Sequence, residues 1–444
     1  MRRVEPPGRI AIIGAGFAGL GVAEALKRHG IEFDQFDSNP ELGGIWRNGG
    51  YAGLHLITPK RTTGYRNFPM PDDYPEFPSG DQLRKYLEKF AQNHGLMASL
   101  NLGKTVSQVD PIGDGTEWRV RFDCGEERIY AGVVAATGHH WLPRYPAVEG
   151  DFTGEQIHSS QYRSPEILRG KRVLVVGGGN SAADIASAAA HAATEAHISM
   201  RNGHWILPKS IHGKPVGEML KSWMPLWMLR PFIRTLLAIS VGDYRRYGLQ
   251  RPNHRLFQHD PTISSQLLYH LQHRRITPHP GIRCFSGREV EFVDGSREEF
   301  DLVCWATGFD ISLPYLPKDV VEIRNHAPQL IAGILPPRHR NLWVFGIGHT
   351  VRPIPRYGVG PLISAGAELV AQAILLQPRF ERPLGELIAK LWPKPPGPFS
   401  IGPTQSLLLA RLIAWAGRRV VGYGNSGRKI ISAGAASPAR RTSI

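Results

Sequence analysis

The 444-residue sequence predicts an α/β fold in which one βαβ-containing domain is inserted into another. Two observations predict this class. A short apolar stretch near the N-terminus runs directly into a glycine-rich turn that opens a helical pattern, and the same arrangement returns about 160 residues later. Because 42% of the residues are hydrophobic and 20% are charged, the chain can bury two such cores, which excludes a disordered class.

The first unit begins with the apolar stretch 9–13, which predicts a buried strand because it ends abruptly at Gly14. Residues 15–28 place apolar side chains at helical spacing and are followed by a glycine cap at Gly30. Residues 31–37 alternate between apolar and polar side chains, which predicts a second strand. These three elements complete a βαβ unit.

The turn of this first unit reads GAGFAG at residues 14–19 and has the GxGxxG spacing. Gly14 permits the tight turn, Gly16 lets backbone N–H groups approach a pyrophosphate, and Gly19 lets the helix pack closely on the strand. Asp37 lies 18 residues beyond Gly19, where a carboxylate accepts hydrogen bonds from an adenosine ribose and repels a 2′-phosphate. The first unit therefore suits FAD or NAD.

The second unit predicts a strand at 173–176, a helix at 180–193 and a strand at 196–200, with the turn GGGNSA at 177–182. Arg201 takes the place equivalent to Asp37, where a guanidinium accommodates the 2′-phosphate of NADP through charge-assisted hydrogen bonds. A solvent-facing arginine is the plainer alternative. The expected cofactor-binding residues of this unit are Gly177, Gly179, Asn180, Ser181, Ser199 and Arg201, with Lys209 as a further donor.

An Ala-Thr-Gly segment ends a predicted strand twice, with Thr137 and Gly138 in the first copy and Thr307 and Gly308 in the second. Both copies precede a change of unit, and we expect both to lie at a cofactor. The sequence therefore predicts two Rossmann-like dinucleotide-binding domains. The FAD domain is discontinuous, with a first part at 1–155 and a second part and basic tail at 291–444, and the NADPH domain with a helical insertion lies between them at 156–290.

Residues 152–162 fit the pattern FxGxxxHxxxY without a mismatch, residues 43–46 read GGIW, and residues 72–78 read DDYPEFP. In this order with the two glycine turns, these motifs resemble the flavin-containing monooxygenases, a family of class B flavoprotein monooxygenases, over most of the chain. The resemblance implies FAD in the first unit, with Gly44 and Trp46 among its contacts, and NADPH in the second. It also makes His158 part of the link between the units, against the alternative of a hydrogen-bonded core histidine.

The resemblance implies a reaction as well. In this family, reduced flavin and O₂ form a C4a-hydroperoxide, which NADP⁺ protects until a soft nitrogen or sulfur nucleophile takes its terminal oxygen. The protein then excludes water and positions the substrate and both cofactors, so the sequence assigns no catalytic residue. The expected partners are a small-molecule nucleophile and O₂.

Two features of the motifs keep alternatives open. Baeyer–Villiger monooxygenases carry a similar signature that ends in Trp-Pro, whereas this chain has Tyr162 and Arg163, which favours N- or S-oxygenation. Ile57 stands where many family members carry an asparagine beside the flavin, and loss of that amide predicts weaker coupling with release of hydrogen peroxide. The alternatives are a ketone monooxygenase, an NADPH-dependent flavoprotein reductase or oxidase without oxygen transfer, and a non-enzymatic adaptor at a membrane surface.

The formal net charge of +15 is concentrated in two segments. Residues 201–258 hold ten Lys or Arg against Glu218 and Asp243, and residues 401–444 hold seven Lys or Arg and no acid. The first segment follows the second glycine turn, where positive potential attracts a phosphate-rich cofactor, so the charge does not require nucleic acid. The basic tail has no assigned role.

The remaining features of the sequence concern location and metals. Residues 223–241 are the most apolar long stretch, but prolines and arginines interrupt it, so it falls short of the roughly 20 apolar residues of a transmembrane helix. It is interpreted either as a lid or core helix or as a basic amphipathic segment in weak contact with a membrane surface. Isolated cysteines and the absence of a secretory pattern favour the cytoplasm. No metal site is predicted, because His270 and His273 adjoin two arginines, whose positive charge disfavours a metal ion. The sequence leaves the oligomeric state open, with a homodimer as one possibility.

Overall fold

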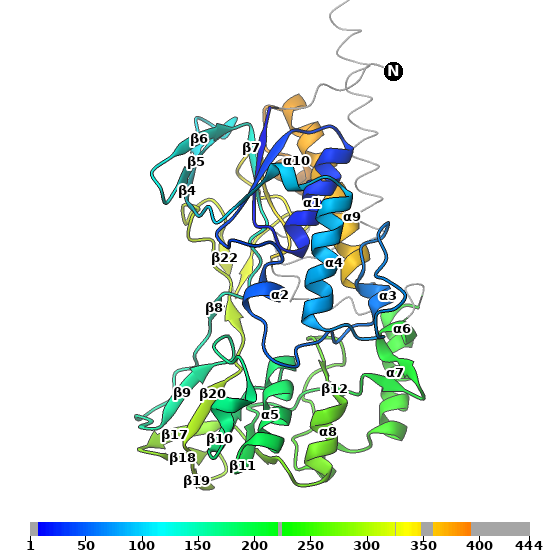
Figure 1. The fold of residues 1–444 in the computed structure, drawn as a ribbon, viewed down its shortest axis with the longest axis vertical. Helices are drawn as coiled ribbons and strands as arrows, with labels where there is room; N and C mark the ends of the chain where they lie inside the picture. Colours follow the sequence, from blue (N-terminus) through cyan, green and yellow to red (C-terminus); the bar gives the residue numbers. More distant parts are fainter. Residues whose placement is uncertain (1–7, 221–223, 325, 348–357, 392–444) are drawn as a thin grey trace, which may run out of the picture.

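The computed structural model describes residues 8–220, 224–324, 326–347 and 358–391. In this part of the chain two units lie one above the other in Figure 1, and each contains a five-stranded parallel sheet. The upper unit contains the N-terminal turn and the lower one the second glycine turn. The α/β class predicted from the sequence is therefore confirmed.

The first unit has its strands in the order β24-β7-β1-β2-β3. All four residues of β1 are buried, because helices cover one face of the sheet and a three-stranded antiparallel sheet covers the other. The strands are β24 (Leu342–Val344), β7 (Gly132–Ala135), β1 (Ile10–Ile13), β2 (Phe33–Asp37) and β3 (Leu100–Leu102). The covering layers are α1 (Phe17–Arg28), α4 (Gly80–Asn93) and α9 (Val359–Leu376), and β4 (Val106–Ile112), β5 (Glu117–Phe122) and β6 (Glu127–Tyr130).

The second unit repeats this layered plan. Its parallel sheet has the order β16-β11-β10-β20-β9, with helices on one face and another antiparallel three-stranded sheet on the other. The strands are β16 (Thr277–His279), β11 (Glu195–Ser199), β10 (Arg172–Val176), β20 (Leu302–Trp305) and β9 (Glu155–His158). The covering layers are α5 (Asn180–Ala192) and α8 (Ser265–Gln272), and β17 (Ile282–Ser286), β18 (Glu289–Phe292) and β19 (Arg297–Glu299).

The sheet of the second unit extends beyond residue 290, where the sequence analysis placed the return to the FAD domain. β20 pairs in parallel with both β10 and β9, with Val175 opposite Cys304 and Ile157 opposite Cys304. β17 to β19 also pack on this sheet through Phe292 and Phe300. The domain boundary therefore needs correction to a point after Trp305, because β20, the strand between β10 and β9, comes from a distant part of the chain.

The other described elements are short or belong to the helical insertion. They are α2 (Ile45–Asn48), α3 (Lys60–Thr63), α6 (Val216–Met219), α7 (Leu226–Ser240) and α10 (Leu384–Leu391), and the strand pairs β8 (Leu142–Pro143) with β21 (Phe309–Asp310), β12 (Ile206–Leu207) with β15 (Thr262–Ile263), β13 (Ser210–Ile211) with β14 (Lys214–Pro215), and β22 (Ile323–Arg324) with β23 (Ala327–Pro328).

Two apolar helices bear on the question of membrane contact. α7 covers most of the apolar stretch seen in the sequence and buries Leu229, Ile233 and Leu237 in the second unit, while Trp227 is 74% exposed. Trp223 lies outside the described residues. Among those described, one helix, Val359–Arg379, is long and apolar enough to cross a membrane, and 56% of its apolar window is buried. It contains α9, which packs along α1 as a core helix of the first unit.

Two histidines lie side by side at the edge of the second sheet. His197 Nδ1 on β11 is 2.9 Å from His279 Nε2 on β16, and the His279 ring stacks on Phe292 with 4.1 Å between centroids. Burial, together with the neighbouring His197, lowers the pKa of His279 to about 4. Burial also lowers the pKa of His197. Both imidazoles are therefore neutral in the folded protein at pH 7.

We expect this pair to make the second unit sensitive to acid. An unfolded histidine takes up a proton near pH 6.5, whereas folded His279 does so only near pH 4. The contribution of His279 to stability is therefore constant above pH 6.5 and is lost as the pH falls between these values. Allowing for its partial exposure, His279 accounts for a loss on the order of 2 kcal/mol. His279→Phe keeps the ring stack without the titration and should flatten the fall. Melting temperatures at pH 7, 6 and 5 test this, and parallel slopes for the two proteins would contradict it.

Candidate functional site

The first glycine turn joins β1 to α1 and has no room for a side chain at two of its glycines. Gly14 has φ of +111°, and an ideal Cβ there would lie 2.4 Å from the carbonyl oxygen of Ala136. A Cβ on Gly19 would lie 2.0 Å from the carbonyl oxygen of Gly14. These close contacts allow the sharp turn and bring α1 onto the sheet, as the sequence analysis predicts for both glycines.

Gly16 and Gly44 face each other beside this turn. An ideal Cβ on Gly16 would lie 3.6 Å from Gly44 Cα, and one on Gly44 would lie 3.1 Å from Gly16 Cα. Gly44 directly precedes α2, which carries Trp46, and Gly43 N–H donates to the Ala15 carbonyl at 3.0 Å. The two backbone segments therefore form a cradle without side chains, which is what the close approach of a pyrophosphate requires.

The carboxylate of Asp37 is turned toward the same glycine turn from the end of β2. Its Oδ2 accepts a hydrogen bond from Ala15 N–H at 2.7 Å, and its Oδ1 accepts from Asn39 N–H at 2.9 Å and from the Asn39 side chain at 2.8 Å. A negative group held at this place accepts hydrogen bonds from ribose hydroxyls and repels a phosphate. The geometry thus fits FAD in the first unit.

The second glycine turn repeats the construction of the first. Gly177 has φ of +141°, and an ideal Cβ there would lie 2.2 Å from the Ala306 carbonyl oxygen, as Gly14 relates to Ala136. Gly179 precedes α5, and a Cβ there would meet nothing within 4 Å. Asn180 Oδ1 accepts from Ile263 N–H at 2.8 Å and ties the turn to β15, while Ser181 lies in the first turn of α5. The open space at Gly179 fits a second pyrophosphate.

The three polar residues expected around the 2′-phosphate differ in placement. Arg201 lies two residues after β11, is exposed, and makes no ion pair within the described residues. Ser199 is only 1% exposed and donates its hydroxyl to the Pro280 carbonyl at 2.6 Å, so this hydroxyl faces the interior. Lys209 contacts His55 of the first unit instead. Arg201 is therefore the charge that this loop offers to a phosphate.

The two Ala-Thr-Gly segments occupy equivalent places in the two units. In each, the alanine N–H donates at 2.8 Å to the carbonyl of the last residue of the strand that precedes the glycine turn. The alanine carbonyl oxygen packs against the first glycine of that turn. The Thr137 hydroxyl lies 3.2 Å from that of Tyr315, and the Thr307 hydroxyl donates to the Arg144 carbonyl. Gly138 and Gly308 follow with positive φ and lead the chain out of each sheet.

The chain crosses between the units along β8 and β21, which are antiparallel neighbours. Arg144 N–H donates to the Gly308 carbonyl at 3.0 Å, and its guanidinium lies 2.7 Å from Asp310. His158 is fully buried, and its Nε2 is 3.0 Å from the same Gly308 carbonyl. Burial lowers the pKa of His158, so the ring is neutral. His158 thus packs at the link, where the family resemblance places it.

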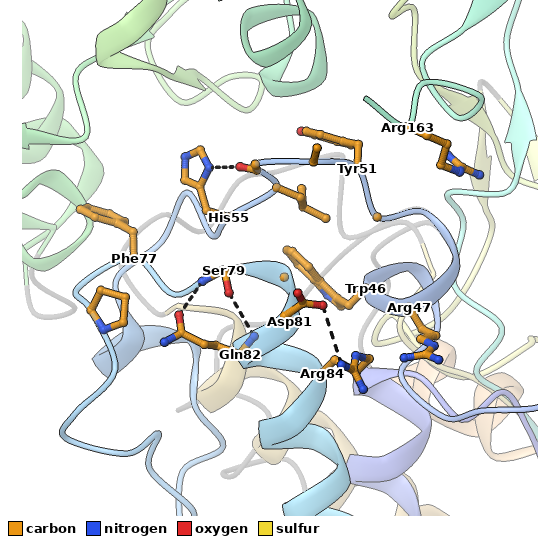
Figure 2. Close-up of a pocket in the computed structure, with 16 residues that line it drawn as sticks. Trp46, Arg47, Tyr51, His55, Phe77, Ser79, Asp81, Gln82, Arg84 and Arg163 are labelled. Carbon is orange, nitrogen blue, oxygen red and sulfur yellow. Dashed lines mark hydrogen bonds and ion pairs between the residues drawn. The ribbon is translucent and has the colours of Figure 1, made fainter. Parts of the chain in front are cut away.

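A cavity of about 560 Å³ opens beside the first cofactor cradle. Figure 2 shows the Trp46 indole in the middle of its lining, below Tyr51. Arg163, directly after the FxGxxxHxxxY signature, reaches the cavity from the second unit and donates to the Ser160 carbonyl at 2.7 Å. The lining is Trp46, Arg47, Gly50, Tyr51, Ala52, Gly53, Leu54, His55, Pro75, Phe77, Ser79, Gly80, Asp81, Gln82, Arg84 and Arg163.

The segment that contains Ile57 directly follows residues 50–55, which line the cavity and are called the cavity loop here. Lys60 Nζ donates to the carbonyls of Asp72 at 2.7 Å and Tyr74 at 2.6 Å and so fixes the loop that follows. Ile57 is half-buried and brings no amide to this place. Asn67, ten residues further along the chain, is exposed, and its side chain makes no hydrogen bond within the described residues. The expectation of weaker coupling stands as a prediction.

The structure shows a polar contact between the units that the sequence does not predict. Tyr51 donates its hydroxyl to Asp184 Oδ2 on α5 at 2.6 Å, and Lys209 packs against His55 with its ammonium 5.7 Å from the Phe77 ring. Burial raises the pKa of Asp184 and lowers that of Lys209. The partners are far apart in sequence, and no spacing rule connects them. They hold the cavity loop against the helix that carries the second glycine turn.

These features define a class of protein. The two units have the same dinucleotide-binding plan. The first has a carboxylate, Asp37, after its second strand, and the second has a guanidinium, Arg201, at the equivalent place, as expected of a flavoprotein that takes electrons from NADPH. In the described ranges no three His, Cys, Asp or Glu side chains gather to hold a metal ion.

Comparisons with known proteins agree with this class. A family model described as flavin-binding monooxygenase-like matches residues 7–352. Flavin-containing monooxygenase 5 of Oryctolagus cuniculus is 30% identical over 358 residues, which cover 74% of this chain and 67% of the relative. Indole-3-pyruvate monooxygenase YUCCA1 of Oryza sativa subsp. japonica is 30% identical over 333 residues, which cover 72% and 81%. A cyclohexanone monooxygenase structure with bound epsilon-caprolactone shares the fold at 18% identity, with a TM-score of 0.69 over 93% and 98% of the two chains.

The chain belongs to the flavin-binding monooxygenase-like family. It is a flavin-dependent monooxygenase that uses NADPH and O₂, and its cofactors are FAD and NADPH. The cradle at Gly16 and Gly44 and the open turn at Gly179 fit these two groups.

Proposed function

We propose that the protein transfers one oxygen atom of O₂ to a soft nitrogen or sulfur nucleophile. NADPH supplies a hydride and thus two electrons, one oxygen atom bonds to the lone pair of the substrate, and the other leaves as water with two protons. FAD, when bound, supplies the reaction with O₂. The observation that carries the proposal is the signature of residues 152–162, in which Tyr162, followed by Arg163, stands where ketone monooxygenases have Trp-Pro.

The residues around the site bind, orient and exclude water in this proposal. Gly16 and Gly44 leave room for the pyrophosphate of FAD, and Arg201 binds the 2′-phosphate of NADPH. Tyr51 and Asp184 keep the cavity loop against the second unit, which limits the entry of water. Because the oxygen atom is transferred to a lone pair, no side chain needs to abstract a proton from the substrate.

Rapid mixing tests this function. The FAD-loaded enzyme is reduced by NADPH without oxygen and then mixed with O₂ and either dimethylaniline, a thioether or cyclohexanone. We expect flavin bleaching by NADPH, followed by formation of the amine oxide or sulfoxide. Because Ile57 offers no amide, part of the electrons from NADPH should reduce O₂ only to hydrogen peroxide. Bleaching with hydrogen peroxide as the sole product would refute oxygen transfer and favour a reductase or oxidase.

Ketone oxygenation is a second candidate, supported by the fold shared with cyclohexanone monooxygenase. The same experiment separates the two candidates. A lactone formed from cyclohexanone at a higher rate than the amine oxide or sulfoxide would favour the ketone reaction over the one proposed.

A further inference from the structure

The second glycine turn carries a histidine that neither the motifs nor the resemblance assigns. An ideal Cβ on Gly178 would lie 2.3 Å from His204 Cδ2 and 2.5 Å from His204 Nε2. The imidazole therefore lies flat against the backbone of the turn, at a place where any other residue at 178 would displace it. His204 is three residues beyond Arg201 in the same loop, so its contact with Gly178 brings the loop of the 2′-phosphate site against the glycine turn of the pyrophosphate site.

The His204 ring is followed by two further histidine rings on the loop that packs against this turn. The His204 and His254 rings are 6.2 Å apart between centroids, and those of His254 and His259 are 5.0 Å apart. The loop that carries the second and third rings is fixed to the turn, because Thr262 donates its hydroxyl to the Gly178 carbonyl. Burial lowers the pKa of His204, and the two neighbouring imidazoles lower it further. His204 is thus a neutral ring without a hydrogen-bonded partner among the described residues.

The charges on the packed elements are mostly positive. Arg201 lies on the loop of His204, and Arg251 and Arg255 lie on the loop of His254. Arg251 is paired with Asp243 at 2.5 Å. Desolvation raises the pKa of Asp260, next to His259, to about 6. The glycine turn itself carries no titratable side chain. Without an anion the surroundings keep His204 uncharged, whereas phosphate groups at the turn would favour its protonated form.

We propose that His204 is a phosphate-binding residue of the NADPH site and takes up a proton when the dinucleotide binds. The inference rests on the assignment of NADPH to the second unit. The proton comes from solvent and stays on the imidazole, which then donates a charge-assisted hydrogen bond to a phosphate oxygen. Binding of NADP⁺ then becomes tighter as the pH falls toward 6.5, and the ring adds a second cation to that of Arg201.

Calorimetry of NADP⁺ binding to the FAD-loaded protein tests this inference without turnover. Titrations in two buffers of different ionisation enthalpy give the number of protons taken up, and titrations at about pH 8 and pH 6.5 give the pH dependence of Kd. We expect His204→Gln to take up fewer protons than the unsubstituted protein and to bind NADP⁺ about tenfold more weakly at the lower pH, with a smaller difference at the higher pH. Because the 2′-phosphate of NADP⁺ titrates in the same pH range, the role of His204 is measured by the difference in proton uptake and in Kd between the two proteins.

His273→Gln serves as the matched control, because this exposed histidine lies after α8, where its Nδ1 contacts the Tyr269 carbonyl and its ring packs on that of Tyr269. It should bind NADP⁺ and take up protons as the unsubstituted protein does. Equal proton uptake by His204→Gln would overturn the role of His204, whereas failure of the unsubstituted protein to bind NADP⁺ would overturn the NADPH assignment itself. If His204→Gln does not fold, the NMR titration of carbon-13-labelled histidine decides: an unchanged His204 pKa on addition of NADP⁺ overturns the inference, and a raised one supports it.

Discussion

Gly16→Leu is expected to abolish FAD retention, so that the protein purifies colourless. An ideal Cβ at this position meets Gly44 Cα at 3.6 Å, an ordinary contact, so the fold tolerates the first carbon. The rest of the leucine side chain fills the space between the two backbone segments, where the pyrophosphate approaches. Flavin absorbance relative to protein absorbance measures the loss, and circular dichroism shows whether the fold persists.

The same substitution in the second unit provides the matched control. Gly179→Leu places its side chain in the open turn before α5, where a Cβ meets nothing within 4 Å. This variant should purify yellow, like the unsubstituted protein, and should fail to be bleached by NADPH. A yellow Gly16→Leu protein with a full complement of FAD would contradict the assignment of the first turn.

Arg201→Ala is expected to raise the KM for NADPH about 10- to 100-fold while leaving that for NADH nearly unchanged. The guanidinium is exposed and unpaired within the described residues, so its contribution arises only when a phosphate arrives. Charge-assisted hydrogen bonds of this kind contribute about 1.5–3 kcal/mol, which corresponds to the stated range. Steady-state rates of oxidation of NADPH and of NADH, at varied concentration of each, measure the change in the two KM values.

Arg246→Ala separates this contact from general attraction by the basic segment. Arg246 is exposed, lies in the same charged stretch 201–258, and carries the same charge. Its removal should change both KM values little and equally, because it affects only the long-range potential. A rise for NADPH as large as in Arg201→Ala would show that the net charge, and no specific contact, selects the phosphate.

The local parts of the fold and site are predictable from the sequence. The elements expected at 9–13, 15–28 and 31–37 correspond to β1, α1 and β2, because strand, turn and helix follow from spacing within about 30 residues. Gly14, Gly19 and Gly177 have the close backbone contacts that their motifs imply. Asp37 is predictable for the same reason. It is the last residue of β2, which ends beside the first glycine turn, so its carboxylate reaches Ala15 N–H.

What the sequence could not supply is long-range pairing. β20 joins the second sheet from about 130 residues beyond β10, so no local pattern places the domain boundary after Trp305. Ser199 has the right position along β11 but turns its hydroxyl to Pro280, since side chains alternate along a strand. The Tyr51–Asp184 hydrogen bond and the contact of His204 with Gly178 also join segments that only the fold brings together.

The paired crossings between the units limit how the units move. β8 and β21 are bonded to each other, and Arg144 and Asp310 fasten them side by side. A single strand would leave the second unit free to swivel about its own bonds, whereas a two-stranded ribbon resists torsion and extension and bends mainly across its flat face. The ribbon therefore opposes twisting of one unit against the other, so we expect a change in the separation of the two dinucleotide turns to require bending at β8 and β21.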